Sequence, residues 1–66
     1  MKVTDLREAH GMSQAQLAAK AKLHPSTVSA IESGRLEPYP IQARKLARAL
    51  HWQGDIDDLF KEDNNG

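Results

Sequence analysis

The residues of this sequence that could catalyse a reaction do not form a recognisable catalytic pattern. The three histidines, His10, His24 and His51, are widely spaced, and no hydroxyl residue stands in a recognisable catalytic motif. The chain has no cysteine, which excludes disulfides and thiolate metal sites. We therefore expect no catalytic residue and no enzymatic activity.

One acidic stretch has the spacing that begins a calcium-binding loop. Asp55 and Asp57 alternate as the first ligands of such a loop do, but Phe60 stands at the sixth position, where glycine is needed. The sequence therefore predicts no metal site, and nothing in it indicates another cofactor.

The charges are divided unevenly along the chain, although they sum to zero. Residues 1–54 contain eight basic and four acidic residues, a balance of +4, and residues 55–66 contain one basic and five acidic residues, a balance of −4. A basic body favours contact with the phosphates of nucleic acid, whereas zero net charge argues against it. Ordinary solvated surface charge accounts for part of the pattern.

The length of 66 residues allows one small domain, which we place at residues 1–62, followed by a flexible polar tail at residues 63–66. No apolar run approaches the ~20 residues that cross a bilayer, and the polar N-terminus does not fit a signal peptide. We expect a soluble, cytoplasmic protein that does not bind membranes.

Apolar spacing and turn residues predict two short helices in the first third of the chain. The first covers residues 3–10 and stops at Gly11, a residue suited to the left-handed conformation that ends helices. Ser13 and Gln16 form a capping box, so the second helix begins at Gln14. Its buried face consists of Leu17, Ala18 and Ala21.

A third helix begins at Pro25, whose missing N–H costs nothing at the first helical position. Val28 and Ile31 face inward, and the helix ends at Gly34. The link before it, residues 22–24, is long enough only for a tight turn. Two short helices joined in this way form a helix-turn-helix unit, here residues 13–34.

The residue pattern in the second half of the chain predicts a loop at residues 35–39 and two more helices after it. Pro40 opens the fourth helix, and Asp55 caps the fifth. Each of these helices has apolar residues at helical spacing, which we expect to face the core. They are Ile41, Ala43, Leu46, Ala47 and Leu50 in the fourth helix, and Ile56, Leu59 and Phe60 in the fifth. No segment has the pattern of a strand, so the predicted fold class is all-α with five helices.

The arrangement of these residues resembles the lambda-repressor-like, Cro/repressor family of XRE-type helix-turn-helix proteins over about residues 3–60. The resemblance implies a compact five-helix DNA-binding domain, and a transcriptional regulator, a repressor, of prokaryotic or phage type. It also implies a homodimer on a palindromic operator in double-stranded DNA. The matching segments are residues 6–9, 11–14, 17–18, 21, 26–29, 31–32, 34, 37–38 and 46–50.

The sequence departs from the family pattern at three points. Lys22 replaces a glycine of the turn and would cost on the order of 1 kcal/mol in a left-handed conformation. His24 replaces the usual serine or threonine cap of the third helix. The loop before Asp55 is longer than usual, through residues 53–54. These changes leave the fold intact, and they bear on the detailed geometry of the turn and on the angle at which the third helix is presented.

By position, the third helix would enter the major groove of DNA with a strip of small side chains. Serine hydroxyls can hydrogen bond to most base edges, small apolar groups can pack on thymine methyls, and histidine can donate to guanine or contact phosphate, unless it serves only as a helix cap. No Arg, Asn or Gln occupies the strip, so we expect modest base discrimination supplemented by DNA shape. The residues predicted to read bases are His24, Pro25, Ser26, Ser29 and Ala30.

A second set of residues matches the positions that contact the DNA backbone in the family. The N-terminus of the second helix offers free N–H groups to a phosphate. The residues predicted to contact phosphate are Gln14, Lys22, Thr27, Ser33 and Arg35. Arg7 and Glu32 match a pair that joins the first and third helices, so we expect an ion pair there. A solvated face explains the basic residues at positions 44, 45 and 48 better than a binding patch.

A protein-interaction module is the alternative, either an antitoxin or a regulator's partner with secondary DNA binding. The zero net charge and the weakly reading third helix favour it. The sequence does not identify the dimer surface. Four apolar residues near the C-terminus are candidates for it, but packing in the core explains each of them equally well: Trp52, Ile56, Leu59 and Phe60.

Overall fold

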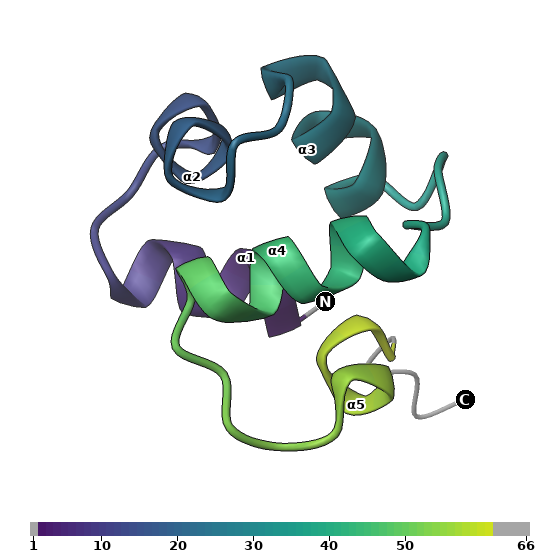
Figure 1. Ribbon diagram of the computed structural model, residues 1–66. Helices are drawn as coiled ribbons and strands as arrows, with labels where there is room; N and C mark the ends of the chain where they lie inside the picture. Colours follow the sequence, from purple (N-terminus) through teal and green to yellow (C-terminus); the bar gives the residue numbers. More distant parts are fainter. Residues whose placement is uncertain (1, 62–66) are drawn as a thin grey trace.

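The computed structural model describes residues 2–61 of the chain (Figure 1). Within that range there are five α-helices and no strand, and none of the helices is long and apolar enough to cross a membrane. The predicted domain end at residue 62 and the predicted tail lie outside the described residues. The helices are α1 (Lys2–Ala9), α2 (Gln14–Ala21), α3 (Pro25–Glu32), α4 (Pro40–Ala49) and α5 (Ile56–Phe60).

The predicted capping box sets the start of α2. The hydroxyl of Ser13 accepts from the backbone N–H of Gln16 at 3.0 Å, and the side chain of Gln16 accepts from the backbone N–H of Ser13 at 2.8 Å. Gly11, just before it, has φ +71°, the left-handed conformation expected at the end of α1. Together these residues fix the angle between α1 and α2.

The turn between α2 and α3 has a lysine in the left-handed conformation. Lys22 has φ +60° and ψ +46°, and the N–H of Leu23 reaches back to the carbonyl of Ala18 at 2.8 Å. This closes the C-terminus of α2 as a glycine normally would, at a cost of about 1 kcal/mol for the extra Cβ. The departure at Lys22 therefore preserves the turn.

The core lies where the inner faces of the helices meet. Figure 1 shows α1 and α4 in the middle, with α2 and α3 on one side and α5 on the other. The predicted buried faces of α2 and α3 are confirmed, since Leu17, Ala18, Val28 and Ile31 are fully buried and Ala21 is 4% exposed. The other large, fully buried side chains are Val3, Leu46, Leu50 and Leu59.

Several expectations about the later helices need correction. Ile41 is 53% exposed, because Ala43 and Leu46 define the buried face and Ile41 lies about 200° around the helix from Ala43. Helix α3 ends at Glu32, and Gly34 follows it with φ +81°. Asp55 precedes α5 at the N-cap position, but its side chain makes no capping hydrogen bond.

Candidate nucleic-acid interface

The start of α3 is held by a pair of polar side chains. His24 occupies the N-cap position, and its Nδ1 accepts from the backbone N–H of Ser26 at 3.2 Å. The hydroxyl of Ser26 lies 2.7 Å from the same nitrogen. Because Nδ1 accepts a hydrogen bond, the neutral ring carries its proton on Nε2. His24 thus caps the helix and retains an N–H that can donate to another molecule.

The five residues predicted to read bases share one face of α3. His24, Pro25 and Ser26 are exposed, whereas Ser29 and Ala30 are half-buried. Positions 25, 26, 29 and 30 recur at helical spacing, and the buried residues of α3 lie on its other face. The exposed face therefore presents small hydrogen-bonding groups and no long side chain.

The residues predicted to contact phosphate flank this face. Lys22 is exposed in the turn before α3, and Thr27 is half-buried within the helix. At the other end, the hydroxyl of Ser33 donates to the carbonyl of Ala30 at 3.1 Å and accepts from Nε of Arg35 at 3.0 Å. The guanidinium is thereby held beside the C-terminus of α3.

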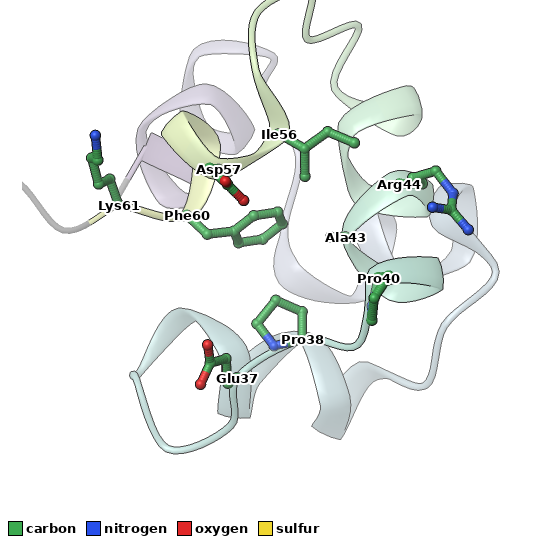
Figure 2. A pocket seen from close by; sticks show the side chains of 9 residues that line it. All are labelled: Glu37, Pro38, Pro40, Ala43, Arg44, Ile56, Asp57, Phe60 and Lys61. Carbon is green, nitrogen blue, oxygen red and sulfur yellow. The ribbon is translucent and has the colours of Figure 1, made fainter.

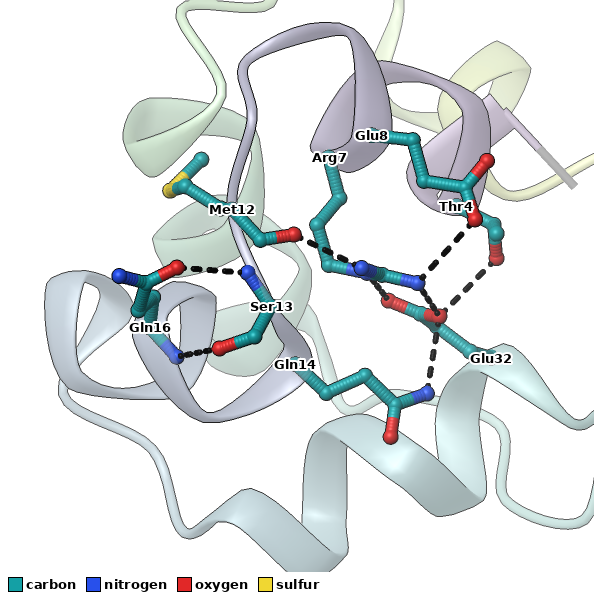
Figure 3. Close-up of polar contacts among 8 residues, drawn as sticks. All are labelled: Thr4, Arg7, Glu8, Met12, Ser13, Gln14, Gln16 and Glu32. Atoms are coloured by element: carbon teal, nitrogen blue, oxygen red, sulfur yellow. Dashed lines mark hydrogen bonds and ion pairs between the residues drawn. The ribbon is translucent and has the colours of Figure 1, made fainter.

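An ion pair joins α1 to α3, as the sequence predicted. Nε of Arg7 lies 2.8 Å from Oε2 of Glu32, and Nη2 lies 3.2 Å from Oε1, so the pair is bidentate (Figure 3). The side chains of Arg7 and Glu32 are only 12% and 5% exposed. Nη1 also donates to the carbonyl of Met12 at 2.8 Å. One guanidinium therefore braces α1, the following turn and α3.

Two more side chains complete this cluster, and sequence reasoning missed both contacts. Gln14 donates from Nε2 to Oε1 of Glu32 at 3.0 Å, and the hydroxyl of Thr4 donates to the same oxygen at 3.1 Å. Burial alone would raise the pKa of Glu32, but the hydrogen bonds from Arg7, Gln14 and Thr4 outweigh it and lower that pKa. Thr4 could have been identified from its position one turn before Arg7.

The structure therefore gives Gln14 a role besides its predicted phosphate contact. One N–H of its amide is used by Glu32, while the second forms no hydrogen bond within residues 2–61. The amide can hold α3 and donate outward at the same time.

Two of the histidines that are distant in the sequence come together in space. The ring centroids of His10 and His51 are 6.2 Å apart, and His51 is in the left-handed conformation with φ +56°. Both side chains are exposed. No group of three or more metal-ligating side chains forms within residues 2–61.

Comparisons with known proteins agree with this geometry. A family model described as helix-turn-helix matches residues 3–51, which cover α1 to α4 except for Lys2, the first residue of α1. A protein of Methanothermobacter thermautotrophicus, named an uncharacterised HTH-type transcriptional regulator, is 34% identical over 64 residues, covering 97% of this chain and 91% of that protein. No solved structure matches the chain.

Proposed function

The chain belongs to the XRE-type helix-turn-helix family of transcriptional regulators, and we propose from this premise that it represses transcription by binding operator DNA. Its five helices have the all-α, lambda-repressor-like fold. The observation that carries the proposal is the exposed face of α3, where His24 and Ser26 present hydrogen-bonding groups at the helix N-terminus. We propose no catalytic activity, because regulators of this kind act by binding.

In the proposed complex, residues 25–33 enter the major groove, which is about 12 Å wide and admits one helix. Ser26 and Ser29 hydrogen bond to base edges, and Ala30 packs against thymine methyl groups. The flanking residues contact phosphates and set the register of the helix. Since no Arg, Asn or Gln lies on this face, sequence-dependent DNA shape supplies part of the specificity.

We further propose that two copies bind a palindromic operator, in the cytoplasm of a prokaryote or during phage infection. Half-sites for this class lie about 34 Å apart, and the domain measures 32 × 23 × 21 Å. Two domains placed with their 32 Å dimension along the DNA would match one turn. Two copies are also needed because one domain of this size buries too little surface for tight discrimination.

A protein-interaction module is the second candidate. It is favoured by the zero net charge and by the absence of residues that form bidentate base contacts on α3. In that case α3 would recognise a toxin or another regulator, and DNA binding would be weak and indifferent to sequence.

A polarisation titration on the DNA upstream of the protein's own gene tests the proposal. At ~50 mM salt, where phosphate contacts are strongest, we expect specific binding that withstands competition from unrelated DNA. Arg35→Ala should weaken it, because the guanidinium is held beside the C-terminus of α3. Failure to bind any upstream or genomic DNA under these conditions would overturn the proposal.

A further inference from the structure

A groove lined by four basic side chains lies between α2 and α4, and none of its lining residues belongs to α3, although Lys22 is in the turn before that helix. It has a volume of about 290 Å³, and no acidic residue lines it. We call it the basic groove, and its lining residues are Ala21, Lys22, Ile41, Arg44, Lys45, Arg48 and Ala49.

The positive charge of this groove is not neutralised within residues 2–61. Within residues 2–61, the ion pairs join Arg7 to Glu8 and Glu32, and Lys61 to Asp58, so none of them involves a residue of the groove. The basic side chains of the groove also form no hydrogen bond within that range. Four exposed cations so close together repel one another, and an anionic partner would relieve that repulsion. The groove is therefore suited to a ligand with several negative charges.

The floor of the groove indicates what kind of anion it suits. Ile41 is 53% exposed and supplies the apolar surface of the groove, whereas Ala21 and Ala49 beneath it are only 4% and 5% exposed. Bare phosphates gain nothing from this apolar surface, whereas a protein surface with both carboxylates and apolar side chains can bury it. The lining thus favours an acidic protein surface over the DNA backbone.

The chain carries such a surface next to the basic groove, along the same helix α4. Four carboxylates and one lysine lie at α5 and in the loop before α4, with Arg44 at their border. We call this set the acidic face: Glu37, Asp55, Asp57, Asp58 and Lys61. A second groove of about 550 Å³ runs through it, with Pro38, Pro40, Ile56 and Phe60 as its apolar lining (Figure 2). Arg44 lines both grooves, so the basic groove and the acidic face flank the same helix.

We propose that the basic groove receives the acidic face of a second copy of this chain. The two patches lie side by side along α4. A two-fold axis would therefore bring the basic groove of each copy against the acidic face of the other copy, which is the geometry of a self-complementary dimer. The proposal builds on the dimeric regulator proposed above, but it is tested without DNA.

Charge reversal on each patch separately provides the test. Variant one carries Lys45→Glu and Arg48→Glu, and variant two carries Asp55→Lys and Asp57→Lys; all four side chains are exposed. In sedimentation equilibrium at ~50 mM salt, each variant alone should dissociate about 10-fold or more readily than the wild type. Mixed together, they should associate again, because each patch then meets its opposite charge. Raising the salt to ~500 mM should weaken the wild-type dimer.

Lys20→Glu serves as the matched control, since Lys20 is an exposed base on α2 that does not line the groove; it should leave association unchanged. Circular dichroism checks that each variant folds. A wild type that is monomeric up to ~1 mM, a dimer indifferent to both reversals, or variants that stay apart when mixed would each overturn the proposal. Loss of DNA binding with charge-dependent association intact would overturn the proposed function alone.

Discussion

The amide of Gln14 donates to Oε1 of Glu32 across 3.0 Å, which links the first residue of α2 to the last residue of α3. The same carboxylate is held by Arg7 of α1. The residue expected to contact a DNA phosphate is therefore tied to the helix expected to read bases. In the proposed complex, a phosphate that orders Gln14 would also fix the position of α3, and would thereby couple backbone contact to base reading.

Removing Arg7 should be among the most destabilising substitutions in the protein. Arg7→Ala leaves the carboxylate of Glu32 buried, at 5% exposure, without its cationic partner, and such a loss costs about 3 kcal/mol. Since a small domain has only about 5 kcal/mol to lose, urea unfolding should show a variant that retains less than half of the wild-type free energy of unfolding. The double variant Arg7→Met, Glu32→Leu should recover much of the loss. A double variant no more stable than Arg7→Ala would contradict this account.

The lowered pKa of Glu32 makes part of the stability depend on pH. The folded state favours the ionised carboxylate, so its contribution is complete above the ordinary pKa of 4.5 and is lost as pH falls through the lowered value. The difference in free energy of unfolding between wild type and Glu32→Gln should therefore narrow as the pH is lowered from 7 toward ~3. Urea titrations at each pH measure that difference, and a constant or widening gap would contradict the prediction.

The sequence predicted local structure well because local structure rests on local chemistry. Ser13 and Gln16 cap α2 and Pro25 starts α3 through contacts within a few residues. The exposure of Ile41 and the meeting of His10 with His51 depend on how distant helices pack, which periodicity does not encode. Similarly, the candidate dimer surface is reduced, since Leu59 is fully buried and therefore unavailable to a partner.

Replacing Lys22 with glycine should separate stability from DNA binding. Glycine accepts φ near +60° without a Cβ clash, so Lys22→Gly should stabilise the fold by about 0.5–1 kcal/mol. It also removes a proposed phosphate contact, so DNA affinity should fall and the salt dependence of binding should flatten. His51→Gly is the control, because it relieves the same conformation at φ +56° without touching the interface. Equal DNA affinity in the two variants would exclude a phosphate role for Lys22.

Two substitutions of His24 should distinguish its capping role from its role toward DNA. His24→Ala removes the acceptor for the Ser26 N–H and should cost about 1 kcal/mol of stability. His24→Asn retains a good N-cap acceptor, so its melting temperature should stay near that of the wild type. Both lose the outward Nε2–H, and a selection from randomised DNA should show the same altered base preference for both. A wild-type preference in the asparagine variant would mean that His24 is only a cap.

The proposed interface contains residues that read bases and residues that contact phosphates, and substitutions should distinguish the two kinds. Ser26→Ala and Ser29→Ala should change the relative affinities for different operator sequences, because they remove groups proposed to meet base edges. Gln14→Ala and Arg35→Ala should weaken all sequences alike, since phosphates are the same everywhere. Competition titrations across operator variants measure both effects. Because Gln14 also holds Glu32, Gln14→Ala should lower the stability of the fold as well, whereas Arg35→Ala should not. A uniform loss of affinity across sequences for all four variants would refute the division into base-reading and phosphate-contacting residues.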